Sequence, residues 1–351
     1  MRNQAGSLSS DAPIEEKPST KKPLFLWLLQ LLLVGLWICV EIILIAWAAG
    51  AFYFDLPAST HVRTTAAIIW FVVGVVAVLF GGFRGRVLVL IVFLGIVGWW
   101  LTLRPTQDAD WQPDVARIPH ATIQGDQITV HDIRNFDYRT ATDFTPQYET
   151  QVFNLANLRG LDLFINYWGS PYMAHPIVSF DFGPQGHLCF SIEIRPKVGQ
   201  EYSPLGGLYR RYELIYIAAS ERDVIRLRTN FRHEDIYLYH LKLPVPEVRI
   251  RLMEYLSRIN ELYERPEWYN EVTENCTTSI RAQHPRSQRI PWDWRMLLNG
   301  FMDQMLYERH LLVGNLPFAE LKERALINER ALGARDATHF SERIRAAAPG
   351  F

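Results

Sequence analysis

Three apolar runs before Arg104 constrain this chain more strongly than any other feature of its sequence. The run at residues 23–50 is long enough to cross the roughly 30 Å hydrocarbon core of a bilayer, because a helix advances by about 1.5 Å per residue. The runs at residues 64–82 and 87–103 are just long enough to do the same. The sequence therefore predicts a membrane domain of three transmembrane helices at about residues 23–103.

The first run has a competing interpretation as a secretory signal peptide, because two lysines precede it and an Ala-Trp-Ala sequence lies near its end. Its apolar length exceeds that of a typical signal, which favours a helix that stays in the membrane. Within this run Gln30 and Glu41 lie close to three whole helical turns apart and are expected to point the same way. Polar groups are costly in hydrocarbon, so the pair indicates either helix packing or a proton or head-group contact.

Basic residues indicate the orientation of the three helices. Arg84 and Arg86 lie in the short connection between the second and third runs, and the polar N-terminal tail at residues 1–22 ends in lysines. Under the positive-inside rule both flanks are cytoplasmic, so three crossings place everything after Arg104 outside the cytoplasm. The tail itself is rich in Ser, Pro, Lys and Glu, a composition that predicts disorder.

The composition of the whole chain is that of a folded protein. The chain is 49% hydrophobic and 13% aromatic, which excludes a disordered protein. Its net charge of -1 and isoelectric point near 6.8 provide no basic face for a nucleic-acid partner. Three cysteines, one of them Cys39 in the first apolar run, do not make a disulfide framework. We expect a polar linker at residues 104–118 and an extracytoplasmic domain at residues 119–351.

Short runs of β-forming residues, bounded by Gly, Pro and Asn, predict several strands in this domain. The four clearest runs are residues 121–136, 175–182, 187–194 and 212–219. Apolar spacing suited to one buried helical face predicts helices as well. These helical patterns are residues 157–168, 246–264 and 293–312 and a charged tail that begins at Pro317. Strands and helices together predict an α+β fold class with an antiparallel sheet.

The predicted hairpin at residues 175–195 brings histidines and carboxylates together. Alternation with a period of two puts His175, His187 and Glu193 on one largely polar face and the large apolar residues on the other. One of two allowed registers places His175 directly opposite Glu193 and His187 opposite Asp181, and the other makes the first relation diagonal. A carboxylate beside an imidazole fixes its tautomer, as in a catalytic base. The alternative is that these are ordinary solvent-facing residues, an interpretation that suits His187 beside the turn.

The segment YNEVTENCTTSI at residues 269–280 places Cys276 among small polar residues at the predicted start of a helix. A helix N-terminus carries partial positive charge, which favours a thiolate and therefore a nucleophile. The alternative is a buried structural cysteine. Asn275 is a candidate oxyanion donor and has an equally good interpretation as a helix cap.

Several motifs occur in a characteristic order, and they are RNFDYRT, HPIVSFDF, SIEIRP, GGLYRRYELIYIAASERDVIRLRTN, IYLYHL and YNEVTENCTT. In this order they resemble the periplasmic domain family named after Lnb, the lipoprotein intramolecular transacylase, over approximately residues 120–345. The resemblance implies a permuted papain-like, cell-wall-amidase-like cysteine fold and a bacterial inner membrane protein. It implies that Cys276 is the nucleophile and His175 the base, while Glu193 is the orienting residue mainly by the pairing argument. Members of the Lnb type carry membrane helices after this domain, whereas here three precede it. The resemblance therefore predicts the fold of this chain better than it predicts the substrate.

The function expected is a membrane-anchored cysteine acyltransferase or hydrolase that acts on acyl esters of lipids or lipoproteins through an acyl-thioester. The alternatives are a membrane-tethered cysteine amidase or peptidase of the cell envelope, and a non-catalytic envelope assembly factor. Further candidates for substrate contacts are Arg134, Arg139, Arg195 and His187. No cofactor is expected, and no metal, because the histidines lack a third ligand at recognisable spacing.

Overall fold

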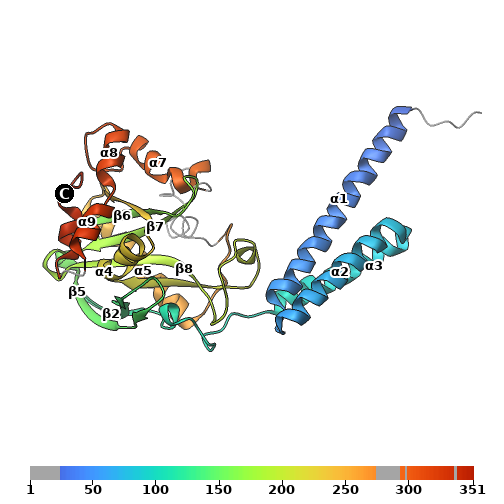
Figure 1. The fold of residues 1–351 in the computed structure, drawn as a ribbon, viewed down its shortest axis with the longest axis horizontal. Helices are drawn as coiled ribbons and strands as arrows, with labels where there is room; N and C mark the ends of the chain where they lie inside the picture. The colour runs from blue at the N-terminus through green and yellow to red at the C-terminus, as the bar shows by residue number, and fades with distance from the viewer. Residues whose placement is uncertain (1–23, 274–292, 297–298, 336–337) are drawn as a thin grey trace, which may run out of the picture. The chain divides into compact units, whose positions relative to one another are not determined.

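The computed structural model describes residues 24–273, 293–296, 299–335 and 338–351 (Figure 1). The described chain falls into two compact units, an N-terminal helical unit and a larger unit that contains residues 101–351.

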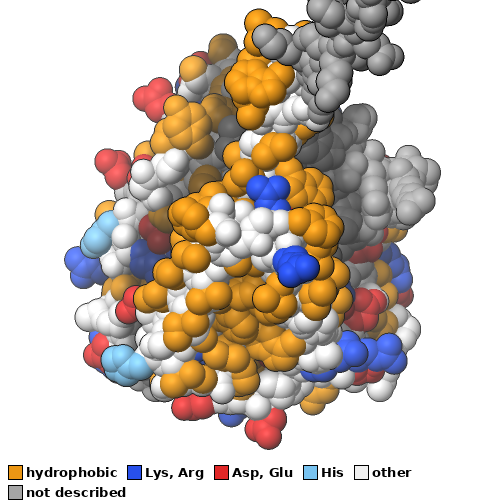
Figure 2. Space-filling view, turned by 90° about the vertical axis from the view of Figure 1, so that its right-hand side faces the viewer, with side chains coloured by type: hydrophobic (Ala, Val, Ile, Leu, Met, Phe, Trp, Pro, Cys, Tyr) orange, Lys and Arg blue, Asp and Glu red, His pale blue; other side chains and the backbone are white. Residues whose placement is uncertain are grey.

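Residues 24–102 contain three helices long and apolar enough to cross a membrane, namely α1 Leu24–Asp55, α2 Thr60–Phe80 and α3 Gly82–Thr102. Their most apolar windows have mean hydropathies of 2.6, 2.2 and 2.0. Most of their large apolar side chains are exposed, as suits helices surrounded by lipid (Figure 2). The protein is therefore an integral membrane protein. Arg84 and Arg86 lie within α3 rather than in a connection before it, because the helix continues almost directly from α2.

Glu41 of α1 is buried against two neighbours of the helical unit. Its Oε1 accepts a hydrogen bond of 2.8 Å from Trp37 Nε1, one turn earlier, and its Oε2 lies 3.6 Å from Arg86 Nε. A carboxylate in an apolar setting is stabilised by such a cation and donor. These contacts support helix packing as the role of Glu41, with Arg86 as its charged partner.

The larger unit is an α+β domain built on a mostly antiparallel sheet, as predicted (Figure 1). Within the described residues this sheet has eight strands, in the order β1-β2-β9-β8-β7-β6-β10 with β5 paired to β2. The strands are β1 His120–Gln124, β2 Gln127–Arg134, β5 Tyr148–Asn154, β6 Gly160–Tyr167, β7 Ala174–Asp181, β8 His187–Arg195, β9 Glu213–Ala219 and β10 Asp235–His240. A separate small ribbon pairs β3 Asp137–Tyr138 with β4 Phe144–Thr145.

The segment at residues 157–168 is a strand, so the prediction of a helix there was wrong. Strand β6 runs between β7 and β10, and its residues from Gly160 to Asn166 are all buried. A strand covered on both faces carries apolar residues in close succession, and the run LDLFI imitates the spacing of an apolar helical face.

Helices cover both faces of the sheet. On one face α5 Val245–Glu264 and α7 Met302–Glu308 pack with α8 Phe318–Ala325 over the large apolar side chains of the hairpin, including Phe180 and Phe190. The other face is covered by α4 Glu221–Arg226, the π-helical segment Leu227–Phe231, α9 Asn328–Ala334 and α10 Phe340–Arg345. The largely polar side of the hairpin is consequently buried as well: Ser179, Cys189 and Ser191 are at most 1% exposed.

The helix predicted at residues 246–264 is confirmed as α5, and the tail after Pro317 is helical as predicted. The helix predicted at residues 293–312 is instead broken. The described residues there form the short 3-10 turns Trp294–Met296 and Asn299–Phe301 followed by α7. Gly300 lies close to the backbone of Pro171 and Tyr172, where a Cβ atom would lie 2.2 Å from the Pro171 carbonyl oxygen. This close approach requires glycine at the break.

Candidate functional site

The β7–β8 hairpin has the register that places His175 opposite Glu193. Ile177 pairs with Ser191 and Asp181 pairs with His187, which is one of the two registers expected from the sequence. At the open end of the hairpin His175 Nε2 lies 3.2 Å from Glu193 Oε1. The structure therefore brings together the imidazole and the carboxylate that the alternation pattern placed on one face.

Ser191 joins this pair and fixes the tautomer of the imidazole. Its hydroxyl lies 2.6 Å from Glu193 Oε1, and an ionised carboxylate only accepts hydrogen bonds, so Ser191 Oγ is the donor in that contact. The same Oγ lies 2.7 Å from His175 Nε2 and is therefore the acceptor there. His175 consequently carries its proton on Nε2, which leaves Nδ1 with the lone pair that a general base needs.

Arg228 completes the surroundings of Glu193. Its Nη2 donates to Glu193 Oε1 at 2.5 Å, and its Nη1 donates to the Val224 carbonyl at 3.0 Å. Burial alone would raise the pKa of the Glu193 carboxyl, but the charges of His175 and Arg228 outweigh that effect and hold the pKa well below its ordinary value. Glu193 is therefore ionised at neutral pH and can stabilise a protonated His175.

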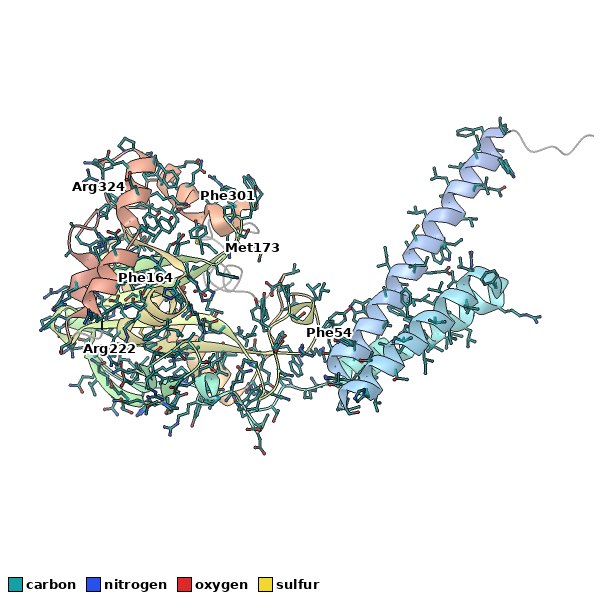
Figure 3. All side chains as sticks on the ribbon, viewed as in Figure 1. Phe54, Phe164, Met173, Arg222, Phe301 and Arg324 are labelled. Atoms are coloured by element: carbon teal, nitrogen blue, oxygen red, sulfur yellow. The ribbon has the colours of Figure 1, made fainter. Side chains whose placement is uncertain are left out.

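His175 and Glu193 line a cavity of about 790 Å³ among the described residues. Trp168 and Met173, in the loop between β6 and β7, stand at its edge and are each 43% exposed, and Trp168 meets the His175 ring edge to face. Residues 299–301 hold this loop, since Gly300 N donates to the Tyr172 carbonyl; Figure 3 shows the labelled Met173 and Phe301 on neighbouring segments. His175 thus faces a space large enough for a small-molecule group.

Cys276 and Asn275, the predicted nucleophile and oxyanion donor, lie outside the described residues. The two thiols that the structure does describe are Cys39 in α1 and Cys189 in β8. Cys189 is fully buried, and burial raises the pKa of its thiol well above the ordinary value. It therefore stays a protonated thiol and does not act as a nucleophile.

Arg134 lines the cavity, but its guanidinium is already engaged. Nε donates to Asp223 Oδ1 at 2.9 Å, and Nη2 lies 2.8 Å from the same oxygen. Nη1 donates to the Asp114 carbonyl. Arg134 is 3% exposed, so its main role in the structure is to neutralise the buried Asp223 carboxylate.

The structure does not bring the other three predicted substrate contacts to His175. Arg139 is exposed and pairs with Asp143 on the small β3–β4 ribbon. Arg195 donates to the carbonyls of residues 115 and 116 and lies over the Trp111 ring, which fixes the linker to the sheet. His187 sits beside the turn, at the opposite end of the hairpin, with Nε2 3.8 Å from Asp181 Oδ1. His187 is therefore separated from the cavity by the length of the hairpin strands.

Asp162, His187 and Glu221 form the one group among the described residues whose ligand atoms lie close enough for a metal ion, within 4.8 Å of one another. Arg345 of α10 already occupies this group. Its Nη2 lies 2.6 Å from Asp162 Oδ2 and 2.6 Å from Glu221 Oε1. A guanidinium between two buried carboxylates supplies the positive charge that a metal would otherwise bring, so this cluster fits an internal ion-pair network better than a metal site.

Sequence reasoning missed three side chains near the pair: Ser191, Arg228, and Asn166 of β6, which lines the same cavity. Ser191 carried a usable signal, because alternation puts it on the same face as Glu193 two residues later. Asn166 was hidden by the incorrect helix at residues 157–168. Arg228 comes from the π-helical segment that follows α4, and local sequence does not reveal that this segment packs over the open end of the hairpin.

In a comparison with protein families, residues 144–300 match the Lnb N-terminal periplasmic domain. The matched region contains β6, the β7–β8 hairpin, α5 and the segment with Cys276. Comparison with curated proteins and with solved structures gave no match. The family resemblance inferred from the ordered motifs is thereby confirmed for this part of the chain.

Proposed function

We propose, from the match of residues 144–300 to the Lnb N-terminal periplasmic domain, that the protein is a membrane-anchored thiol acyltransferase or hydrolase that acts on acyl esters of lipids or lipoproteins. The observation that carries the proposal is the contact series from His175 through Ser191 to Glu193, at the edge of a cavity. A thiol nucleophile needs a base to take its proton and a further residue to orient that base, and this series supplies both.

In the proposed first step, Nδ1 of His175 takes the proton of the Cys276 thiol. The thiolate attacks the carbonyl carbon of an ester, a carbon–sulfur bond forms, and the carbon–oxygen bond to the alcohol breaks as the imidazolium returns the proton to the leaving oxygen. Glu193 stabilises the imidazolium through its negative charge, and the product is an acyl-thioester on Cys276. The Cys276 backbone N–H and the Asn275 side chain are the proposed oxyanion donors.

Two further features support a thiol enzyme at a membrane. Cys189 is excluded as a nucleophile by its burial, and Cys39 lies within the membrane helix α1, which leaves Cys276 as the thiol of the extracytoplasmic region. The family is periplasmic, and the three apolar helices tether the domain to a bilayer, where acyl esters are abundant. We propose the bacterial inner membrane as its location, with the N-terminus in the cytoplasm as the basic flanks predict.

We also propose that the domain is a permuted papain-like domain. The order of the site residues supports this, because the histidine strand β7 precedes Cys276 in the chain. The antiparallel sheet that carries His175 and Glu193 on neighbouring strands is compatible with it. A test of the fold itself is the distance between Cys276 Sγ and His175 Nδ1 in an experimental structure, expected at hydrogen-bond reach.

The proposal is tested with the full-length protein in detergent or nanodiscs, incubated with a diacyl ester lipid or a diacylated lipopeptide. The reaction is stopped with acid, and intact-mass spectrometry then measures the protein. We expect an added fatty-acyl mass that hydroxylamine removes, because thioesters are cleaved under mild conditions. Cys276→Ala is expected to abolish the added mass, and His175→Gln is expected to reduce its rate of appearance by at least about 10²-fold.

Cys39→Ala is the matched control, since it removes a thiol from the membrane helix and should leave acylation unchanged. Cleavage of amide substrates that depends on Cys276, without any acyl mass from esters, would replace the proposal by an envelope amidase or peptidase. A folded Cys276→Ala variant with full cellular function would support a non-catalytic assembly factor instead.

A further inference from the structure

The segment at residues 198–208, between β8 and β9, presents large apolar side chains on the surface of the larger unit. Leu205 is 64% exposed, Tyr202 is 50% exposed and Leu208 is 40% exposed. Glu201 is the one charged residue in this segment. Several exposed apolar side chains in one short segment, rather than scattered singly, indicate a contact with a protein or a membrane.

A tight turn places the two leucines together. Gly206–Leu208 form a 3-10 turn, in which Leu208 N donates to the Leu205 carbonyl at 3.2 Å. Side chains three positions apart eclipse in such a turn, so Leu205 and Leu208 lie on the same side of it. Gly206 and Gly207 between them are buried, and a Cβ atom on Gly207 would lie 2.8 Å from Glu271 Oε2. The glycines therefore pack against the domain while both leucines face outward.

The residues that follow this turn contact the end of membrane helix α1. Residues 54–57 belong to the same compact unit as residues 101–351, and Phe54 and Asp55 are the last two residues of α1. Phe54, labelled in Figure 3, stacks on Tyr209 with 5.1 Å between the ring centroids. Arg210 N donates to Asp55 Oδ2 at 3.1 Å. The chain next to the exposed leucines is thus held at the point where α1 ends.

Arg210 also contacts the end of α3, which lies on the same side of the bilayer as the end of α1 because α2 separates the two helices in the chain. Its Nη1 donates to the carbonyl of Leu103, the residue after α3. A cation at a helix C-terminus is favourable, and an arginine suits the head-group layer. At about 1.5 Å per residue the 21 residues of α3 span roughly the 30 Å of the hydrocarbon core, so α3 ends at the edge of that core. Leu208 is two residues from Arg210 and thus within about 7 Å of it, a distance similar to the roughly 5–8 Å thickness of one head-group layer.

We propose that residues 198–208 form a membrane-contact surface that inserts Leu205 and Leu208 into the extracytoplasmic leaflet of the bilayer that α1, α2 and α3 span. Lipid is the occupant of this surface because the surface continues directly from the ends of two membrane helices. Apolar side chains next to tyrosine and arginine are also typical of segments that lie in the membrane interface.

The same segment forms part of the cavity wall. Gln200, Glu201 and Tyr202 line the cavity that also holds His175. Insertion of the two leucines would therefore bring one wall of the cavity to the lipid surface. The membrane contact itself does not depend on the proposed thiol chemistry, and it can be measured without any reaction.

The test uses the full-length protein in nanodiscs of phosphatidylethanolamine and phosphatidylglycerol, with a nitroxide spin label attached at Leu205→Cys or Leu208→Cys. Cys39 and Cys276 are first replaced by alanine so that the label reacts at the chosen position. Electron paramagnetic resonance then measures the accessibility of the label to oxygen and to a water-soluble nickel chelate. Oxygen is apolar and concentrates in hydrocarbon, whereas the chelate stays in water.

Leu332→Cys on α9 is the matched control, because Leu332 is a leucine with a similar exposure of 48%. We expect the ratio of oxygen to chelate accessibility at both loop positions to exceed the ratio at the control by at least about fivefold. All three side chains are exposed, so the labels should leave the fold intact.

Leu205→Asp provides a second measurement, with the label kept at Leu208→Cys. A carboxylate is unfavourable in the hydrocarbon, so the substitution should lift the turn out of the leaflet and reduce the ratio at Leu208→Cys to within about twofold of the control value. Leu332→Asp introduces the same charge on α9 and should leave the ratio at Leu208→Cys unchanged.

Two results would overturn the proposed membrane contact. Equal ratios at Leu205→Cys, Leu208→Cys and Leu332→Cys would show that the segment faces water. Labels at both loop positions that are shielded from oxygen and from the chelate alike would show that a protein, or a second copy of this chain, covers the segment instead of lipid. Since neither measurement needs an acyl-enzyme, failure of the proposed thiol chemistry would leave this inference unaffected.

Discussion

Arg228 Nη2 lies 2.5 Å from Oε1 of Glu193, the same carboxylate oxygen that lies 3.2 Å from His175 Nε2. One oxygen thus faces a guanidinium that is always charged and an imidazole that would become charged in the proposed reaction. The Arg228 side chain is 5% exposed, so the carboxylate neutralises a buried cation even when His175 is neutral. Glu193 therefore has a structural and a chemical role, and the two can be measured separately.

The chemical role predicts that Glu193→Gln lowers activity sharply. Glutamine has nearly the same size but no charge, so it cannot stabilise the imidazolium of His175. Loss of the orienting carboxylate in related nucleophile–base systems costs up to about 10⁴-fold, and we expect a decrease in kcat/KM of roughly 10²- to 10⁴-fold. The measurement is the rate of acyl-thioester formation on Cys276.

Asp181→Asn is the control for this substitution. Asp181 faces His187 at the other end of the same hairpin, with 3.8 Å between Oδ1 and Nε2, so the control removes a matched carboxylate–histidine pair outside the cavity. Its rate should stay within threefold of the wild type. Equal losses in both variants would mean that Glu193 acts only through the stability of the hairpin.

The structural role predicts a pH-dependent difference in stability between the wild type and Glu193→Gln. The pKa of Glu193 in the folded state lies well below its ordinary value of 4.5, because the charges of His175 and Arg228 outweigh the effect of burial. A lowered folded pKa gives stability that is fully present above the unfolded pKa and is lost as the pH falls through the folded pKa. Thermal unfolding should show a constant advantage of the wild type from about pH 5 to 7 that shrinks below about pH 4.5. An advantage that grows on acidification would contradict the assignment.

The sequence predicted the hairpin with its chemistry because alternation and turn signals are local properties. Val178, Phe180 and their partners alternate with a period of two, and this pattern alone limits the register to two choices, one of which the structure has. The pair of His175 and Glu193 follows from that register. The membrane helices were equally predictable from the sequence, because their length and hydropathy are local properties as well.

The sequence did not predict the contributions that depend on distant packing. Strand β6 was interpreted as a helix because a strand covered on both faces loses its alternation, and the error concealed Asn166. Arg228 contacts Glu193 across 35 positions in the chain, through a π-helical segment that no periodicity indicates. Arg195 and Arg134 were expected to contact substrate, yet both hold neighbouring chain segments, because surface arginines and buried structural arginines look alike in sequence.

Asp303 of α7 anchors the C-terminal helices to the sheet, and Asp303→Asn is predicted to lower stability. Its carboxylate is 1% exposed; Oδ2 accepts from Tyr239 at 3.1 Å and lies 2.7 Å from Lys322 Nζ. Asparagine keeps an acceptor for the tyrosine but leaves the lysine unpaired. Because the Lys322 side chain is 32% exposed and can reach water, we expect a loss of about 1–3 kcal/mol in the free energy of unfolding.

Denaturant unfolding of the full-length protein in detergent measures this loss. The double variant Asp303→Asn with Lys322→Met removes the unpaired cation and should recover part of it. A change below about 0.5 kcal/mol in the single variant would show that the ion pair is not needed to hold α7 and α8.

Arg345 lies between the buried carboxylates of Asp162 and Glu221, and its replacement by methionine is predicted to be severe. Both carboxylates are 1% exposed, and each lies 2.6 Å from Arg345 Nη2. Removing one partner of a buried ionic group leaves uncompensated charge, which costs about 3–5 kcal/mol. The thermal midpoint of Arg345→Met should therefore fall by many degrees.

Two comparisons separate the lost charge from damage to α10. Arg343→Met alters an exposed arginine of the same helix and should leave the midpoint within about two degrees of the wild type. Adding Glu221→Gln to Arg345→Met removes one of the stranded charges, so it should restore part of the stability, because a neutral glutamine needs no counter-ion. If the double variant were as unstable as the single one, the guanidinium would hold α10 by its packing over Phe164 and Phe351 rather than by its charge.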